Sequence, residues 1–210
     1  MEILNKLAEN IEAGNAAETK NLTQKALEQG MMASEILNNG LIKGMNSIGV
    51  KFRNNEVFIP EVLVAARAMK GALEILRPLL GEGGADSKGK VVIGTVKGDL
   101  HDIGKNIVGI MLEGAGFEVI DLGTDTPVEK FVEAVKSHKP AVVGLSALLT
   151  TTMPSMKQVV EKLREENLRD AVKVIIGGAP VTQPFADEIG ADGYSADATG
   201  AVDLAKALIN

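Results

Sequence analysis

Hydrophobic residues recur at helical spacing through the first eighty residues. Apolar positions three and four residues apart predict four helices, over residues 3–13, 16–29, 34–50 and 60–80. Gly40 and Gly44 lie on one face of the third predicted helix, where they would allow a neighbouring helix to approach closely. Four helices with short connections are typical of a small helical bundle.

The segment between the third and fourth predicted helices, residues 51–59, is expected to be a loop. It holds three large apolar residues, Phe52, Phe58 and Ile59, among polar neighbours. These side chains either close the end of the bundle or face a partner or cofactor. The sequence alone leaves both interpretations open.

The pattern changes at a glycine-rich polar stretch, residues 81–89, which is typical of a linker. We therefore predict a helical domain over residues 1–80 and a second domain over residues 90–210. In the second domain, short apolar runs predict strands at residues 91–96, 117–122, 141–145, 172–176 and 193–195. Helical patterns follow them near residues 105–115, 128–137, 153–167, 183–189 and 199–209.

Alternating strands and helices of this length predict an α/β fold with a parallel sheet covered on both faces. We expect a flavodoxin-like (Rossmann-like) arrangement with strand order 2-1-3-4-5. The ligand crevice of such a fold lies beyond the ends of the first and third strands. Those ends lead into residues 99–104 and residues 146–152, with Gly177 and Gly178 beyond the fourth strand.

Composition narrows the function classes. A net charge of -6 and a pI near 5.1 argue against nucleic acid or an anionic membrane as the main partner. The chain has no cysteine, which excludes disulfides, thiolate zinc sites, iron–sulfur clusters and a cysteine nucleophile. The amino terminus lacks the pattern of a signal peptide, and no apolar run approaches the roughly 20 residues that span a bilayer. We expect a cytoplasmic protein.

His101, one of two histidines, stands in the loop after the first strand. It could be a metal ligand, a general base or a structural residue. A zinc site needs three or four protein ligands, and the other histidine, His138, lies near the end of a predicted helix, where solvent exposure is expected. A single imidazole beside a carboxylate suits a metal already held by a macrocycle, such as haem or a corrin.

Two other chemistries fit poorly. Residues 94–98 match neither the dinucleotide-binding fingerprint nor a Walker loop. A hydrolase triad could be drawn from Ser146, His101 and Asp99, but Ser146 is not in a Gly-x-Ser-x-Gly elbow.

Three separated motifs resemble a known family. They are Asp99-x-His101-x-x-Gly104, then after 41 residues Ser146-x-Leu148, and after 28 more Gly177-Gly178. This pattern resembles the cobalamin-binding motifs of corrinoid-dependent methyltransferases. The first half resembles the helical cap that precedes the cobalamin domain of methionine synthase. The whole chain is similar to the small stand-alone corrinoid proteins of anaerobic methyltransferase systems.

The resemblance implies a role for each matching residue. His101 would replace the cofactor's own benzimidazole and bind cobalt from below, while Asp99 accepts the other imidazole N–H. A serine that completes a proton relay in the family falls on Thr152 here, where the side chain is β-branched. Phe52 and Ile59 would cover the upper face of the corrin and shield its methyl group. The remaining cofactor-binding positions are Gly98, Leu100, Asp102, Ile103 and Gly104 in the loop, and Ser146, Leu148, Thr150, Gly177, Gly178, Ala179, Tyr194 and Ala198 around the displaced nucleotide tail.

The resemblance also implies a function. The chain would carry a methyl group on a corrinoid, in the methylcobalamin state, from a substrate-specific methyltransferase to a second methyltransferase. The acceptor would be tetrahydrofolate or a thiol, and a separate reductive activator is expected. The alternatives are a cobalamin-responsive sensor, for which the sequence has no helix-turn-helix or basic patch, and a mutase subunit, which would lack such a cap. The methyl donor is left open among methoxylated aromatics, methylamines, quaternary amines and methanol.

Overall fold

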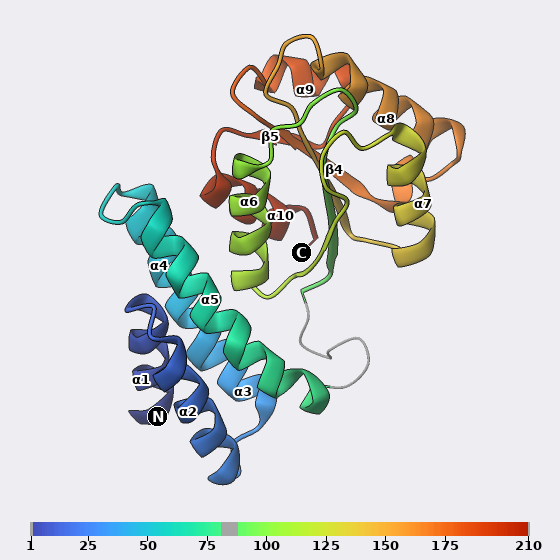
Figure 1. The fold of residues 1–210 in the computed structure, drawn as a ribbon. Helices are drawn as coiled ribbons and strands as arrows, with labels where there is room; N and C mark the ends of the chain where they lie inside the picture. The colour runs from blue at the N-terminus through green and yellow to red at the C-terminus, as the bar shows by residue number, and fades with distance from the viewer. Residues whose placement is uncertain (1, 81–87, 210) are drawn as a thin grey trace. The chain divides into compact units, whose positions relative to one another are not determined.

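The computed structural model describes residues 2–80 and 88–209. They form two compact units (Figure 1), one of which holds the helices before residue 80 together with Ile110–Gly116, and the other the strands and the remaining helices. Of the predicted linker, residues 81–87 lie outside the described part of the chain, and the domain boundaries stay a prediction.

The first unit is helical, as the spacing of its apolar residues predicts. Its elements are α1 (Glu2–Glu12), α2 (Ala16–Glu28), α3 (Ala33–Ile36), η1 (Leu37–Ile42), α4 (Lys43–Arg53), α5 (Ile59–Leu76) and η2 (Arg77–Leu79). The predicted third helix corresponds to α3, the π-helical η1 and α4, which follow one another directly. A Cβ at Gly44 would lie 2.7 Å from the carbonyl oxygen of Ala8 in α1, so the expected close approach at this glycine is confirmed.

The predicted loop over residues 51–59 is wrong at both ends. Phe52 lies within α4, and Ile59 is the first residue of α5, whose start is capped by Glu61 accepting from the N–H of Phe58. Phe58 is 63% exposed and Ile59 39% exposed, so neither side chain closes the end of the bundle. Of the two interpretations, exposure favours residues that face another molecule.

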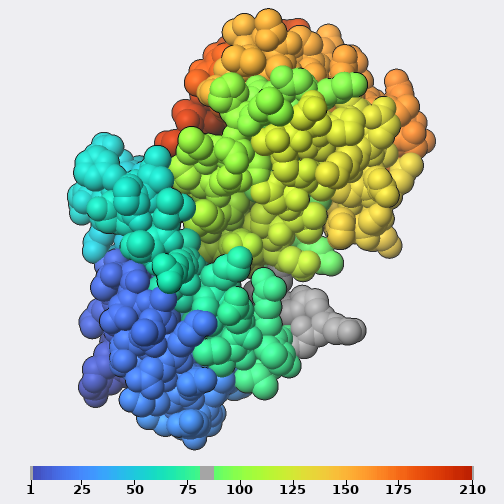
Figure 2. Space-filling model, viewed as in Figure 1, coloured from blue at the N-terminus to red at the C-terminus, as the bar shows by residue number. Residues whose placement is uncertain are grey.

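The second unit confirms the predicted flavodoxin-like fold. Five parallel strands, β1 (Lys90–Thr95), β2 (Glu118–Asp121), β3 (Val142–Ser146), β4 (Lys173–Gly177) and β5 (Gly193–Ser195), lie in the order β2-β1-β3-β4-β5. The helices are α6 (Ile103–Gly114), α7 (Val128–His138), α8 (Met153–Glu165), α9 (Gln183–Ile189) and α10 (Ala198–Ile209), with a short η3 (Arg169–Ala171) before β4. In the view of Figure 2, residues of α6, α7 and the segment between them form one continuous surface.

Alternation along the strands gives each face of the sheet its own core. Val92, Leu145 and Ile176 belong to the hydrophobic cluster that α7, α8 and α9 cover. Ile93 lies on the opposite face beneath α6, where a Cβ at Gly109 would come within 2.8 Å of it. Because all five strands are parallel, their carboxyl ends lie at one edge of the sheet, and the loops that leave this edge lie side by side. Within the described ranges, no helix has the length and apolar character needed to cross a membrane.

Candidate functional site

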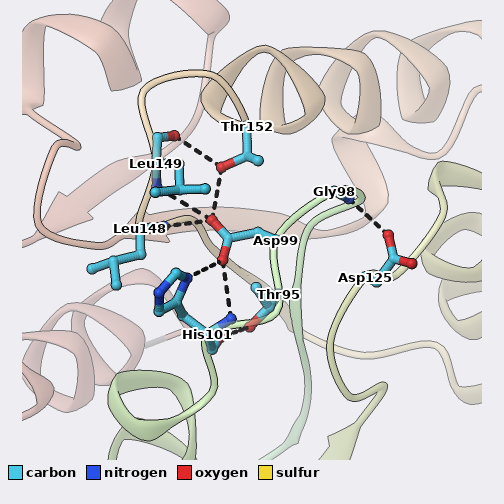
Figure 3. A network of polar contacts seen from close by, with 8 residues as sticks. All are labelled: Thr95, Gly98, Asp99, His101, Asp125, Leu148, Leu149 and Thr152. Atoms are coloured by element: carbon cyan, nitrogen blue, oxygen red, sulfur yellow. Dashed lines mark hydrogen bonds and ion pairs between the residues drawn. The ribbon is translucent and has the colours of Figure 1, made fainter.

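A completely buried carboxylate organises the carboxyl edge of the sheet (Figure 3). Asp99 follows β1, and its Oδ1 accepts from the backbone N–H of His101 at 3.1 Å and lies 2.9 Å from the imidazole Nδ1. Its Oδ2 accepts from the hydroxyl of Thr152 at 2.7 Å and from the N–H groups of Leu148 at 2.8 Å and Leu149 at 3.3 Å. Asp99 thus joins the loop after β1 to the loop after β3.

These contacts determine the protonation of Asp99. Burial by itself would raise the pKa of this carboxyl, but the hydrogen bonds from Thr152, Leu148 and His101 outweigh burial and hold the pKa well below its usual range. Because an ionised carboxylate only accepts hydrogen bonds, the imidazole must donate through Nδ1. The lone pair of the neutral ring then lies on Nε2.

His101 presents that second nitrogen to the outside. The side chain is 52% exposed, and Nε2 has no hydrogen-bond partner among the described residues. The backbone is fixed as well, because the carbonyl of His101 accepts from the hydroxyl of Thr95 at 2.8 Å. In the part of the chain that the structure describes, no group of three or more His, Cys, Asp or Glu side chains could hold a metal ion. The arrangement therefore suits a single axial ligand to a metal held by something else.

Thr152 takes the hydroxyl position that the resemblance implies, despite its β-branch. It is buried at the N-terminus of α8, and its Oγ1 lies 2.7 Å from Asp99 Oδ2 and 2.8 Å from the carbonyl oxygen of Leu149. One hydroxyl proton therefore faces two acceptors. The triad of Ser146, His101 and Asp99 does not form, because among the described residues no hydrogen bond joins the hydroxyl of Ser146 to the imidazole of His101.

Replacing Thr152 with valine is expected to destabilise the protein by about 1.5–3 kcal/mol, because a buried hydrogen bond to a charged group is lost while shape is kept. Thr152→Ser, which keeps the hydroxyl, should lose less than half of that. Urea unfolding of the cofactor-free protein measures both changes. A loss in Thr152→Ser that equals or exceeds the loss in Thr152→Val would contradict a dominant role for the hydroxyl.

Large apolar side chains lie exposed on the two loops that meet at Asp99. Leu100 is 74% exposed, Ile103 69%, Leu148 41% and Leu149 43%. Exposed leucine and isoleucine side chains gathered around one site are typical of a surface that another molecule covers. Together with the outward Nε2 of His101, they fit a flat, largely apolar ring system with a metal at its centre.

Small residues line the sheet edge beside this surface. Thr95, Ser146, Gly177 and Ser195 are register neighbours across β1, β3, β4 and β5, and so share one face. Gly178 follows with a φ of +131°, and a Cβ there would lie 1.8 Å from the carbonyl oxygen of Ala147. Only glycine fits this position.

A Gly178→Ala variant is therefore expected to be less stable by about 2–5 kcal/mol, from backbone strain and overlap with Ala147. Gly104→Ala is the matched control, because a Cβ there would meet no atom within 4 Å. Thermal unfolding of the two variants tests this, and a wild-type midpoint for Gly178→Ala would contradict the geometry.

The structure brings most of the other predicted site residues to this edge. Gly98, Asp102 and Thr150 lie exposed on the two loops, Gly104 is exposed in the first turn of α6, and Ala179 is exposed after Gly178. Tyr194 instead packs against the hydrophobic cluster covered by α7, α8 and α9, on the face opposite Ser195, so it is not brought together with the rest. Ala198 is buried at the start of α10, while Phe52 and Ile59 belong to the helical unit. His138, at the end of α7, is exposed as expected.

Sequence reasoning missed two groups of the site. Asp125 accepts from the N–H of Gly98 at 2.7 Å, and its own N–H donates to the carbonyl of Asp99 at 2.9 Å. Ser195, rather than Tyr194, stands in the row of small residues. The position of Asp125 after the second predicted strand, at the same sheet edge as residues 99–104, was the available signal.

Comparison with known proteins agrees with this geometry. The family described as the B12 binding domain matches residues 89–203, more than half of the chain, and a second B12 binding domain family matches residues 3–77. The chain belongs to the B12-binding corrinoid proteins. The first match contains the whole Asp99 network, and the second contains the helices α1 to α5.

Relatives of this corrinoid protein extend over most of its length. It is 53% identical to dimethylamine corrinoid protein 1 of Methanosarcina acetivorans over 177 residues. The aligned residues cover 84% of this chain and 83% of the relative. It is 44% identical to the trimethylamine corrinoid protein of Methanosarcina barkeri over 100% of this chain and 97% of the relative. A chain of the methanol:cobalamin methyltransferase complex of M. barkeri superposes with a TM-score of 0.89 at 33% identity, covering 99% of this chain and 80% of that one.

Proposed function

We propose that this corrinoid protein carries a methyl group between two methyltransferases, with the corrinoid bound through His101. The observation that carries the proposal is the outward Nε2 of His101, which an ionised, buried Asp99 holds in the ligand tautomer. The bound corrinoid would supply a cobalt atom that accepts and releases the methyl group. The protein's own residues supply binding, orientation and the handling of one proton.

Each residue of the network has a task in this proposal. His101 would bind cobalt through Nε2, and Asp99 holds the proton on Nδ1, which would make the ring a better ligand. Thr152 donates to Asp99 Oδ2 and links this pair to the carbonyl of Leu149. A proton taken up by the pair would weaken the bond from nitrogen to cobalt. Protonation of the protein and the state of the metal are thereby coupled.

The surroundings fit the rest of the cofactor. Leu100, Ile103 and Leu148 would lie against the lower corrin face and exclude water from it. The displaced nucleotide tail would enter beside Ser146, Gly177 and Gly178, where side chains are small or absent. Thr150, Ala179, Tyr194 and Ala198 are assigned to the tail by resemblance alone. Phe52 and Ile59 are proposed to shield the upper face, and the exposure of Ile59 supports a role outside the core of the bundle.

The relatives favour a methylated amine as the donor. Two of them are named as dimethylamine and trimethylamine corrinoid proteins, and the chain covers more than four fifths of each. We infer that the partners are an amine-specific methyltransferase, a second methyltransferase acting on tetrahydrofolate or a thiol, and a reductive activator. Whole-length similarity to corrinoid proteins of this kind favours a carrier over a cobalamin sensor.

The donor assignment predicts a clear preference among partners. The protein would be reconstituted with hydroxocobalamin and reduced. Its methylation by dimethylamine and a dimethylamine methyltransferase should be at least about 10-fold faster than its methylation by methanol and a methanol methyltransferase. A 10-fold preference corresponds to about 1.4 kcal/mol of more favourable interaction with the correct methyltransferase. The corrinoid absorption spectrum follows the transfer. Equal rates, or a faster reaction with methanol, would remove the methylamine assignment.

A further inference from the structure

The loop that carries His101 is held at one end by Asp125, after β2, and at the other end by Asp121, the last residue of β2. We call residues 98–105 the ligand loop. At its first end, the N–H of Gly98 donates to Asp125 Oδ1 at 2.7 Å, and the N–H of Asp125 donates to the carbonyl of Asp99 at 2.9 Å. These two bonds close a ring around the peptide between Gly98 and Asp99; Figure 3 shows the first of them.

Asp125 makes these bonds from an uncommon backbone conformation. Its φ is +48°, in the left-handed region that few residues other than glycine adopt, although asparagine and aspartate do so more often than most. Its neighbours pair with β1. The N–H of Thr126 donates to the carbonyl of Thr95, and the N–H of Thr95 donates to the carbonyl of Gly123. The segment is therefore fixed to the sheet and provides a rigid support for Asp125.

At its other end, the ligand loop finishes in a buried lysine. The side chain of Lys105 is 3% exposed, and its Nζ pairs with Asp121 Oδ2 at the end of β2 and with Asn106 Oδ1 at 2.7 Å. A cation in the first turn of a helix opposes the helix dipole, and burial of an ion is costly. Local helix stability therefore does not explain a lysine here, whereas a fixed link between α6 and β2 does.

We propose that Asp125 and the Lys105–Asp121 pair are positioning groups that set the direction of the His101 imidazole. Neither touches the ring, and both act through the backbone of the ligand loop. This inference rests on the proposed function only in that it names cobalt as the atom His101 must reach. A functional side chain must be held within about 0.5 Å of its working geometry, and a loop that is free at either end would not meet that demand.

Three variants separate this role from general stability. Asp125→Asn keeps an oxygen acceptor and tolerates the left-handed backbone, whereas Asp125→Gly relieves the backbone but removes the acceptor. Lys105→Met keeps the length and apolar stem of lysine without its charge. Lys136→Met is the matched control, because Lys136 forms a 2.9 Å ion pair with Glu166 that links α7 to α8.

The first measurement uses cofactor-free protein, so it does not depend on cobalt. His101 and His138 are the only histidines, and imidazole ¹⁵N shifts report the tautomer of each ring, with His138 as the internal reference. Wild type, Asp125→Asn and Lys136→Met should show His101 protonated on Nδ1. Asp125→Gly and Lys105→Met should show a mixture of tautomers.

The second measurement uses protein reconstituted with hydroxocobalamin and reduced to Co(II). The Kd for the corrinoid should rise about 10-fold in Asp125→Gly and Lys105→Met, the size expected for a lost charge-assisted bond. In protein labelled with ¹⁵N only at histidine, the ¹⁵N doublet in the electron paramagnetic resonance spectrum should weaken in the same two variants. Wild-type tautomers and a wild-type doublet in both would overturn the proposal, and should Lys105→Met not fold, Asp125→Gly decides alone. Failure of the proposed function is a separate result, namely labelled wild-type protein without the ¹⁵N doublet.

Discussion

A His101→Ala variant is expected to lose histidine ligation of the corrinoid and to bind hydroxocobalamin about 100-fold more weakly, or worse, than wild type. Removing even a residue that supports a metal ligand costs 10–100-fold in affinity, and His101 is the ligand itself in this account. The fold should survive, because the side chain is half exposed and its backbone bonds to Asp99 and Thr95 remain. Equilibrium titration and the absorption spectrum of the bound corrinoid measure the two effects.

His138→Ala is the control for this experiment. His138 lies at the exposed end of α7, so its removal should leave both affinity and spectrum at the wild-type values. A His101→Ala protein that binds with unchanged affinity and an unchanged spectrum would take His101 out of its role.

The second large effect is expected for Asp99→Asn, a change of one atom. If the amide oxygen faces His101, its NH₂ group faces the N–H groups of Leu148 and Leu149, which lose their acceptor. If the amide is turned around, its NH₂ group faces Nδ1 of His101, which must then accept, and the ring proton moves to Nε2. Neither orientation leaves both the loop satisfied and Nε2 free to bind a metal.

The variant should therefore lose about 2–4 kcal/mol of stability, the cost of one or two buried unsatisfied groups, and bind the corrinoid about 10–100-fold more weakly. Because folding lowers the pKa of Asp99, the carboxylate stabilises the folded state fully above its ordinary value near 4. That contribution is lost as the pH falls through the lower pKa of the folded state. Wild-type stability should thus fall more steeply in acid than that of Asp99→Asn. Urea unfolding of cofactor-free protein from pH 7 to pH 3 compares them, and parallel curves would contradict the assignment.

The fold could be predicted because its patterns are local. Apolar periodicity located every strand and the four helical segments, and the alternation of strand and helix led to the observed strand order. The π-helical turn at Leu37–Ile42 and the helical position of Phe52 were missed. Both depend on how a few residues at a break in the pattern are hydrogen-bonded, which periodicity does not encode.

The site could be predicted where it lies within motifs. Asp99, His101 and Thr152 are joined by hydrogen bonds as the resemblance implies. Asp125 and the Lys105–Asp121 pair could not be found this way, because their role arises from contacts between distant segments. The face on which Tyr194 and Ser195 lie follows from strand register, and a shift of one residue exchanges them.

The bond from His101 to cobalt is tested most directly by isotope substitution in the unaltered protein. Wild type labelled with ¹⁵N only at histidine would be reconstituted with unlabelled hydroxocobalamin and reduced to Co(II), whose unpaired electron couples to the axial nitrogen. We predict that the triplet splitting of ¹⁴N in unlabelled protein becomes the doublet of ¹⁵N. A triplet that persists in labelled protein would mean that the cofactor's own base stays on the metal, and would contradict the account.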